Sequence, residues 1–318
     1  MNRILVLGAC GQIGSELTME LRKRYGNNSV VATGHRTKPS EKLHDSGPFE
    51  FADILDRESV ERVITKHDVD TIYNMAAILS ARGEQNPQLA FRVNVLGLYN
   101  MLELGREHNL ERIMVPSSIA AFGPGTPKVN TPNETLMRPT TMYGVNKVTG
   151  ELLGNYYFQK YGLDVRGVRY PGIISSGTLP GGGTTDYAVE IYYEALRKKS
   201  YTCYLREDTV LPLMYMPDAI EGIIKLAEAD VSKLKRHCDY NINSMSLSVG
   251  ELAASIKKFI PEFVCEYKPN FRQTIADSWP KSLDDSAARE EWGWQPKYSL
   301  EAMTKDMLTK LSRKLNKG

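Results

Sequence analysis

A glycine-rich turn follows the first apolar segment of the chain and limits its fold more than any other feature. Residues 3–7 (Arg-Ile-Leu-Val-Leu) have the composition of a buried strand, and residues 8–14 (Gly-Ala-Cys-Gly-Gln-Ile-Gly) follow directly. A strand that turns at once into a helix needs a residue without a Cβ, which Gly8 supplies. The pattern predicts a strand, a tight turn and a helix that begins near Gln12.

The same turn predicts a site for the pyrophosphate of a dinucleotide. Gly11 lets the backbone approach the phosphates, and Gly14 lets the helix pack closely on the sheet. The first helical turn, with Gln12 and Ile13, offers unpaired N–H groups and the positive end of the helix dipole. The spacing G-x-x-G-x-x-G is a variant of G-x-G-x-x-G. A glycine-rich turn without a ligand is the alternative, and the agreement of strand, turn and amphipathic helix favours the binding site.

Tyr143 and Lys147 are spaced so that a helix places them on one face. A free tyrosine has a pKa of about 10, so Tyr143 acts as a base at neutral pH only if its pKa falls by about 3. A cation ~5 Å away contributes roughly 3 kcal/mol at an effective dielectric constant of ~20. Lys147 and the charge of an oxidised nicotinamide together could supply this change. A surface tyrosine beside a solvated lysine is the alternative, but the pair opens the apolar helix predicted at 143–161.

A third group with possible chemistry lies upstream, at the end of a predicted buried strand over Arg112–Pro116. The strand delivers Ser117 and Ser118 at its C-terminal end, where ligands of open parallel sheets bind. A hydroxyl there can hydrogen-bond the substrate oxygen and share its proton with Tyr143. We assign this role to Ser118. Capping of the following turn is the alternative role for both serines.

Apolar segments of strand and helix type alternate along the first half of the chain, which predicts an α/β fold with a doubly wound parallel sheet. Further strands are expected at 30–33, 71–74 and 163–169, and helices at 57–66, 88–108 and 143–161. The alternation becomes less regular after about residue 175. There we expect helices at 218–229 and 249–259, a short strand at 239–243, and a smaller lobe that closes the substrate site.

The glycine turn, the strand-end serine and Y-x-x-x-K, in this order, resemble the extended short-chain dehydrogenase/reductase family, which includes sugar-nucleotide epimerases and dehydratases. Segments 53–54, 74–77 and 94–97 match further landmarks of that family. The resemblance implies a Rossmann-type NAD-binding domain over 1–175 and a smaller C-terminal substrate-binding lobe formed mainly by 176–318, with some segments returning to the large domain. It also implies that Asp53 and Ile54 contact the adenine and that Ala76 and Ala77 pass beneath the ribose and nicotinamide.

Segments 170–174, 180–188, 213–219 and 275–280 resemble the L-threonine 3-dehydrogenase branch of the family, and 180–188 (Pro-Gly-Gly-Gly-Thr-Thr-Asp-Tyr-Ala) is the most specific of them. The resemblance implies NAD-dependent oxidation of L-threonine to 2-amino-3-oxobutyrate, in threonine catabolism, without a metal ion. Tyr143 would remove the hydroxyl proton, Ser118 would orient the oxygen, and Lys147 would lower the pKa of the tyrosine and hold the ribose.

Contacts to the substrate are expected from the residues that line the same crevice: Ser80, Ser118, Tyr143, Gly183, Thr184, Thr185 and Trp279. The loop 183–185 is expected to offer backbone N–H and hydroxyl groups to the substrate carboxylate, and Trp279 to wall the pocket on closure. The alternatives are that Thr184 caps a helix starting at Asp186 and that Trp279 is an ordinary core residue.

Two rival functions remain for the same motifs. A nucleotide-sugar epimerase or dehydratase with tightly bound NAD needs room and charge for a diphosphate in the smaller lobe, which segment 180–188 does not obviously offer. A non-catalytic NAD-sensing regulator would be expected to have lost part of the serine, tyrosine and lysine set, whereas all three residues are present.

The end of the second strand leaves the choice between NAD and NADP open. NAD-preferring members usually carry an aspartate where Gly34 stands, and Arg36, after His35, could instead meet a 2′-phosphate. The resemblance to the threonine branch favours NAD. If Gly34 only loosens the hold on the ribose, Gly34→Asp is expected to tighten NAD binding.

Charge and cysteine content exclude several other classes. Lys and Arg number 40 against 38 Asp and Glu in 318 residues, so no imbalance indicates nucleic acid or an anionic membrane as partner. The four cysteines, Cys10, Cys203, Cys238 and Cys265, are scattered without metal-like spacing or a disulfide framework. This fits a reducing compartment, cytoplasmic in a bacterium or the mitochondrial matrix in a eukaryote.

No apolar run has the length of a membrane helix. The first predicted strand starts at residue 3, which leaves no visible leader peptide in this chain. The apolar helices around 89–104 and 152–158 could pair with copies of themselves, as they typically do in extended members of the family, so we expect a homodimer.

Overall fold

The computed structural model describes residues 1–179 and 181–316, and its central layer is a six-stranded parallel sheet. The strand order, β3-β2-β1-β4-β5-β7, follows the Rossmann pattern, in which the first strand lies at the centre and the order reverses beside it. The strands are Ile4–Leu7 (β1), Val30–Gly34 (β2), Phe49–Phe51 (β3), Thr71–Asn74 (β4), Arg112–Met114 (β5) and Val165–Arg166 (β7). The predicted fold class is confirmed.

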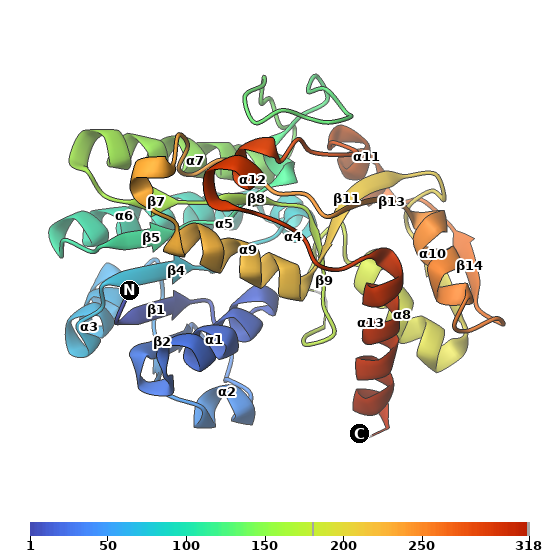
Figure 1. The fold of residues 1–318 in the computed structure, drawn as a ribbon, viewed down its shortest axis with the longest axis horizontal. Coiled ribbons are helices and arrows are strands. Elements are labelled where there is room, and N and C mark those ends of the chain that lie inside the picture. The colour runs from blue at the N-terminus through green and yellow to red at the C-terminus, as the bar shows by residue number, and fades with distance from the viewer. Residues whose placement is uncertain (180, 317–318) are drawn as a thin grey trace.

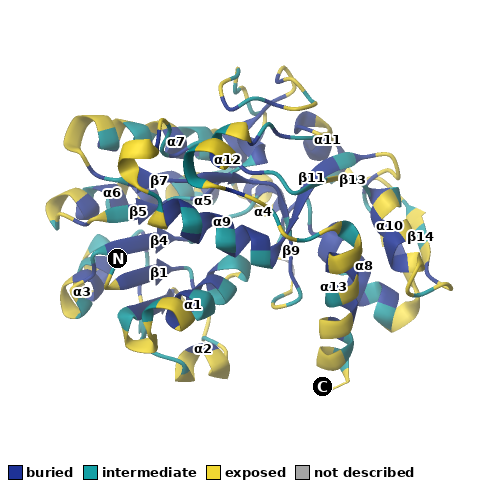
Figure 2. Cartoon of the chain, viewed as in Figure 1, coloured by how far each residue is buried: buried dark blue, intermediate teal, exposed yellow. Residues whose placement is uncertain are grey.

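Helices cover both faces of this sheet (Figure 1). Successive residues of a strand point to opposite faces, so β1 supplies Ile4 and Val6 to one core and Leu5 and Leu7 to the other. The first core lies under α1 (Gln12–Tyr25) and α9 (Met216–Glu228). The second lies under α3 (Arg57–His67), α6 (Gly97–Glu107) and α7 (Met142–Tyr161). Burial on both faces explains why β1 reads as a continuous apolar run. Strands β1, β2 and β4 are buried along their whole length, whereas the edge strand β3 is only partly buried (Figure 2).

Three smaller sheets extend the fold beyond the central layer. One joins Ser117–Ser118 (β6), Val168–Tyr170 (β8) and Tyr240–Asn241 (β12) in parallel. A second joins Gly172–Ile174 (β9), Val210–Tyr215 (β11) and Met245–Ser248 (β13), and a third pairs Ser200–Cys203 (β10) with Val264–Tyr267 (β14). Through β6 and β8 the chain passes from the central sheet toward the C-terminal half.

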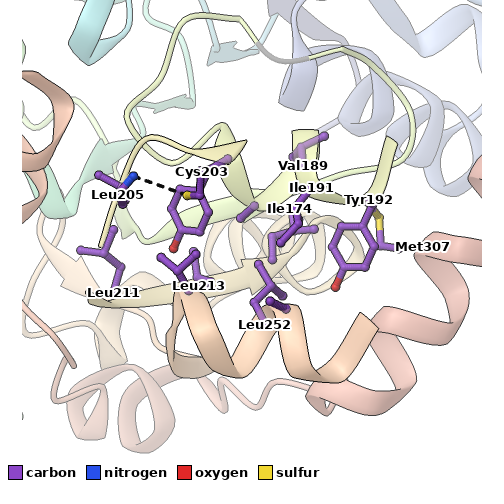
Figure 3. Close-up of a cluster of buried hydrophobic side chains, with 14 of the residues drawn as sticks. Ile174, Val189, Ile191, Tyr192, Cys203, Leu205, Leu211, Leu213, Leu252 and Met307 are labelled. Carbon is purple, nitrogen blue, oxygen red and sulfur yellow. Dashed lines mark hydrogen bonds between the residues drawn. The ribbon is translucent and has the colours of Figure 1, made fainter. Parts of the chain in front are cut away.

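A third hydrophobic core holds the C-terminal half together (Figure 3). Its side chains come from the sheet of β9 and β11 and from three helices packed on it, α8 (Tyr187–Lys198), α10 (Val249–Lys257) and α13 (Leu300–Leu315). Leu213, Tyr192 and Met307 belong to this core and are almost completely buried. The remaining helices are α2 (Glu41–Asp45), α4 (Ser80–Gln85), α5 (Pro87–Phe91), α11 (Phe271–Ser278) and α12 (Ser286–Trp292).

The C-terminal half also contributes to the first core. Ile220 and Ile223 of α9 and Trp294, just after α12, share it with Ile4 and Leu17. A segment far along the sequence therefore helps to bury one face of the central sheet. The division of the chain at residue 175 stays a prediction.

Two predicted elements differ from the structure. The strand expected at 163–169 is split at Gly167, where a Cβ would overlap the Val115 carbonyl oxygen and the N–H donates to the His237 carbonyl at 2.8 Å. The helix expected at 88–108 is three successive helical segments, α5, a π-helical turn at Arg92–Leu96 (η2) and α6. Such π turns are frequent at functional sites. Within residues 1–179 and 181–316, no helix has the length and apolar character needed to cross a membrane.

Candidate functional site

A cavity of about 650 Å³ lies beyond the C-terminal ends of the central strands. Its wall runs from Gly11–Gly14, after β1, across the segments that follow β4 and β5, to the loop 181–186 and Trp279. This is where ligands of open α/β sheets bind. Of the predicted catalytic residues, Ser118, Tyr143 and Lys147 all line it.

The turn after β1 has the geometry that its glycines predict. Gly8 has a φ of 74°, and a Cβ there would lie 2.8 Å from the Ala76 backbone nitrogen. A Cβ at Gly14 would overlap the Gly8 carbonyl oxygen, whereas at Gly11 it would lie 3.2 Å from that oxygen. Gly8 and Gly14 are therefore required by the fold itself, and Gly11 is under a weaker steric constraint. Gly8, at the start of the turn, and Ala76, which packs against it, do not line the cavity, whereas Ala77 does.

The start of α1 suits an anionic ligand. Its N-cap residue, Gly11, provides no side-chain cap, and no acidic residue occupies the first turn. The side-chain Nε2 of Gln12, which lines the cavity, is buried and has no hydrogen-bond partner. Unpaired donors at a helix N-terminus attract phosphate groups. The residues present thus fit the pyrophosphate of a dinucleotide.

The residues predicted at the adenine end surround the ends of β2 and β3. His35 Nε2 lies 3.1 Å from Asp53 Oδ2, and Asp53 Oδ1 accepts from the Leu55 N–H at 2.9 Å. Ile54 is buried, and Arg36 is exposed. These four side chains do not line the 650 Å³ cavity, whose wall includes Cys10 and Thr37.

Close packing at Gly34 argues against the expectation that Gly34→Asp tightens NAD binding, which stays a prediction. A Cβ at Gly34 would lie 2.9 Å from the Thr37 carbonyl oxygen, 3.0 Å from Cys10 Sγ and 3.1 Å from the Phe49 ring. An aspartate therefore cannot enter without moving the backbone that leads to Thr37. The glycine is explained by close packing, which the sequence pattern did not reveal.

Tyr143 and Lys147 lie in the first two turns of α7, which Thr141 caps by accepting from the Gly144 N–H at 3.1 Å. Lys147 Nζ is 5.4 Å from the centre of the Tyr143 ring, so the helix places the two side chains side by side as the spacing predicts. The ammonium donates to the Pro116 carbonyl oxygen at 2.6 Å. This bond ties the first turns of α7 to the segment that carries Ser117 and Ser118.

Burial dominates the acid–base properties of this pair in the absence of a ligand. It raises the pKa of Tyr143 to about 12, although the Ser118 hydroxyl acts in the opposite direction. Burial also lowers the pKa of Lys147 to about 8, and the Glu151 carboxylate opposes that change. Lys147 alone therefore does not make the tyrosine a phenolate near neutral pH. A further positive charge next to the phenol is needed, such as that of an oxidised nicotinamide.

The structure separates the two serines. Ser117 is buried and donates to the Glu151 carboxylate, away from the phenol. Ser118 acts on Tyr143 and accepts from the Ala120 N–H at 3.2 Å, so it also caps the following turn. Ser118 therefore combines both predicted roles: its hydroxyl acts on the Tyr143 phenol, and it caps the following turn.

The loop expected to bind the substrate carboxylate is already bonded within the protein. Asp186 Oδ2 accepts from the N–H groups of Gly182 and Gly183, each at 2.8 Å, and the Thr184 N–H donates to Ser80 Oγ at 3.2 Å. The Thr184 and Ser80 hydroxyls also bond each other at 3.1 Å. The N–H groups of Gly183 and Thr184 are therefore already used within the protein, and their expected role toward the substrate carboxylate stays a prediction.

The sequence left two purely structural roles open near this loop, Thr184 as a helix cap and Trp279 as a core residue, and the structure supports only the second. Thr184 does not cap α8, whose N-cap is Asp186 without a side-chain cap bond. Trp279 does belong to the C-terminal core, and it also lines the cavity. Pro180, the first residue of the segment 180–188, lies outside the described residues.

Sequence reasoning missed three residues that shape the site. Asp186 is the acidic residue among the described residues of the cavity wall, and Arg82 adds a cation at an exposed position. Asn94, in η2, holds the segment after β4 through the N–H and carbonyl of Ile78, at 2.8 and 3.0 Å. The landmark match at 94–97 marked Asn94 as notable, but no local pattern links Asp186 or Arg82 to the cavity.

Comparison with known proteins agrees with this geometry. The NAD dependent epimerase/dehydratase family matches residues 4–243. An uncharacterized epimerase/dehydratase of Staphylococcus haemolyticus is 50% identical over 315 residues, which is 99% of each chain.

Two solved structures are also similar over nearly the whole chain. L-threonine dehydrogenase from Clostridium difficile is 52% identical, with a TM-score of 0.96, and the match covers 99% of this chain and 98% of that one. The holo form of a GalE-like L-threonine dehydrogenase from Cupriavidus necator is 47% identical, with a TM-score of 0.95 and coverage of 97% and 99%. With its Rossmann-type sheet, its glycine turn and its Tyr143–Lys147 pair, this chain belongs to the NAD-dependent epimerase/dehydratase family.

Proposed function

We propose that the protein is an L-threonine 3-dehydrogenase, which oxidises the 3-hydroxyl of L-threonine to give 2-amino-3-oxobutyrate. The observation that carries this proposal is the meeting of Tyr143, Lys147 and Ser118 with the loop 181–186 around one cavity. The similarity to L-threonine dehydrogenases at about half identity over nearly the full chain supports it.

NAD, when bound, supplies the acceptor for the hydride that leaves the substrate Cβ. Tyr143 takes the hydroxyl proton, and Ser118 donates a hydrogen bond to the same oxygen. Lys147 lies beside the phenol and favours its ionised form. Gln12 and the first turn of α1 hold the pyrophosphate, with Gly11, Ile13 and Gly14 at the cavity wall.

The ends of the threonine zwitterion need groups of opposite charge. Asp186 is a buried carboxylate facing the cavity, so we assign it to the ammonium group. The hydroxyls of Ser80, Thr184 and Thr185 are assigned to the substrate carboxylate. Trp279 forms an apolar wall for the methyl group. Burial raises the pKa of Asp186, and the N–H groups of Gly182 and Gly183 oppose that change. The same two hydrogen bonds hold the carboxylate in place before the substrate enters.

The preferred cofactor is proposed to be NAD. Asp53 places a carboxylate beside His35 at the end of β2, and a negative charge there disfavours a 2′-phosphate. Arg36 is the residue that would favour NADP instead, because it is exposed close to the same strand end. Asp53 and Ile54 are assigned to the adenine, and Ala76 and Ala77 to the ribose and nicotinamide.

A homodimer is the proposed assembly. Apolar side chains remain exposed on the helical stretch from α5 to α6 and on α7: Phe91, Leu96, Tyr99, Val145, Leu152 and Tyr156. Leu152 is 62% exposed, which is unusual for a leucine that lies among other exposed apolar residues. Light scattering of the wild type should give the mass of a dimer, and Leu152→Glu should give that of a monomer. A wild-type protein that is monomeric at micromolar concentration would contradict the proposal.

The function is tested by the absorbance of reduced nicotinamide with L-threonine, L-serine and UDP-sugars, each with NAD and NADP. We expect NADH formation with L-threonine, and a kcat/KM for L-serine lower by about 10- to 200-fold, the value of one methyl group in a pocket. Equal use of L-serine, or turnover of UDP-sugars with none of L-threonine, would instead support the epimerase function.

A further inference from the structure

A second, much smaller cavity adjoins the first on the side of Glu151. Its volume is about 20 Å³, which is room for one water molecule. Asn74, Ser117 and Lys147 line both cavities, whereas Glu151 and Asn94 line only the small one. The small cavity therefore lies between the lysine of the site and a buried carboxylate one helical turn further along α7.

The polar groups around this cavity leave unused hydrogen-bonding capacity. Asn74 Oδ1 is buried and has no partner. Lys147 has three donors, and its contact to the Pro116 carbonyl uses one of them. A water molecule here can accept from Lys147 and donate to Asn74, which would satisfy both groups.

Glu151 is held in a fixed position on the other side of the cavity. Its Oε1 accepts from Ser117 and from Arg169 Nε at 2.9 Å, and its Oε2 accepts from Arg169 Nη2 at 2.8 Å. Glu151 and Arg169 are both almost completely buried. A carboxylate has about four acceptor positions, so one stays available on Oε2 for the second proton of the same water.

The titratable and charged groups near Lys147 are few. On its own helix they are the neutral phenol of Tyr143 and the carboxylate of Glu151. Behind Glu151 lies Arg169, on β8. The Arg169 Nη2 atom is 3.9 Å from Asp239 Oδ2. Cys238 also lines the small cavity, and burial holds the pKa of its thiol well above the usual range, so it is neutral. Among these described groups, Glu151 is the anion that shares a cavity with the lysine.

We propose that Glu151 is a positioning residue that keeps Lys147 in its charged form, acting through one water molecule bound in the small cavity. The inference rests on the proposed function, in which the Lys147 charge stabilises the Tyr143 phenolate. It adds a role for Glu151 that is separate from its pairing with Arg169. Burial already drives the pKa of Lys147 down to about 8, so losing the nearby anion should neutralise the lysine within the working pH range.

The test compares the wild type with Glu151→Gln and with Glu151→Asp, which keeps the charge. For each we would measure kcat/KM for L-threonine, and separately the dissociation constant of NADH, from about pH 6 to about pH 9. At the acidic end, kcat/KM of Glu151→Gln should be within about 3-fold of the wild-type value, and at the alkaline end it should be lower by about 10-fold or more. The reason is that lowering the pKa of Lys147 by 1 changes its charged fraction up to tenfold.

The NADH affinity of the glutamine variant should likewise begin to fall at a lower pH than that of the wild type. The aspartate variant should keep the wild-type pH dependence even if its rate is lower. A loss of the same size at every pH would show that Glu151 only supports the fold, and would overturn the proposal.

A second measurement covers the case in which Glu151→Gln does not fold, because that change leaves Arg169 buried without its partner. A high-resolution crystal structure of the wild type should show one ordered water in contact with Lys147 Nζ and Asn74 Oδ1. A dry cavity, or a water that does not contact Lys147, would overturn the proposal. If the wild type does not oxidise L-threonine, the proposed function fails on its own, while the NADH profiles and the crystal structure still decide the role of Glu151.

Discussion

At the Gly11–Gly14 end of the cavity a buried side-chain donor is unpaired, whereas at the 181–186 end the polar groups already bond one another. Gln12 Nε2 has no partner, and the first turn of α1 has no side-chain cap. In contrast, Gly182, Gly183 and Thr184 donate their N–H groups to Asp186 or Ser80. The cofactor end is thus ready for an anion before it arrives. At the substrate end, internal hydrogen bonds fix the loop 181–186. A substrate must therefore bind through the side-chain hydroxyls and the Asp186 carboxylate, or replace the internal hydrogen bonds of the loop.

The residue between the two ends should show the largest effect. Tyr143→Phe removes the proton acceptor at the reacting hydroxyl and keeps the ring that packs beside Lys147. We expect kcat to fall by about 10²-fold or more, while the NADH dissociation constant changes little. Steady-state kinetics and fluorescence titration with NADH measure the two quantities. Turnover near the wild-type value in the phenylalanine variant would remove Tyr143 from its assigned role.

The ionisation of the same tyrosine gives a pH test. Without ligand the pKa of Tyr143 is raised to about 12, so the phenol is neutral at physiological pH. NAD⁺ adds a positive charge, which should lower that pKa, so tyrosinate absorbance should appear at a lower pH with NAD⁺ than without it. The difference should be absent in Tyr143→Phe. An equal titration with and without NAD⁺ would mean that the phenolate is not formed in this way.

At the cofactor end, two glycines offer a matched comparison. Gly14→Ala places a Cβ against the Gly8 carbonyl, and Gly11→Ala places one at 3.2 Å from the same oxygen. We expect Gly14→Ala to weaken NADH binding by about 100-fold or to prevent folding, and Gly11→Ala to weaken it by about 10-fold, since the backbone must approach the pyrophosphate there. Calorimetry and circular dichroism separate the two outcomes. A larger effect at Gly11 than at Gly14 would reverse the ranking.

At the substrate end, two neighbouring threonines should behave differently. Thr184 is buried and bonded to Ser80, whereas Thr185 lines the cavity with no hydroxyl partner among the described residues. Thr185→Val should raise the KM for L-threonine by about 10-fold with little change in stability. Thr184→Val should destabilise the protein by about 1–3 kcal/mol, because it leaves a buried Ser80 group unpaired. Both variants should bind NADH normally, and a loss of NADH affinity in either would show that the two ends are not independent.

The smallest effect is expected at the adenine end. Arg36 is exposed, so Arg36→Ala should change the ratio of kcat/KM for NAD and NADP by only a few fold, with NAD still preferred. Gly34→Asp should weaken the binding of both cofactors, because a Cβ at Gly34 meets the Thr37 carbonyl at 2.9 Å. A strong preference for NADP that disappears in Arg36→Ala would show that the arginine reads a 2′-phosphate.

The contrast between the two ends also explains what could be predicted from the sequence. The glycine turn, α1 and the Tyr143–Lys147 spacing depend on residues a few positions apart, and the structure places them as expected. The bond between Ser80 and Thr184 joins residues 104 positions apart, and nothing local announces it. The crowding at Gly34 likewise involves Cys10 and Phe49, which come near only through the pairing of strands. Hydrogen bonds and close contacts between residues far apart in the sequence could not be predicted from the sequence.

The most direct test of the proposed reaction follows the hydrogen on the substrate Cβ. Wild-type protein would be given L-threonine carrying deuterium at C3, together with NAD, and the nicotinamide product would be analysed by mass spectrometry. We expect one deuterium in the reduced nicotinamide and formation of 2-amino-3-oxobutyrate in equal amount, since Tyr143 removes only the hydroxyl proton. Reduced nicotinamide without deuterium, or deuterium that stays in the amino acid, would contradict oxidation at the 3-hydroxyl.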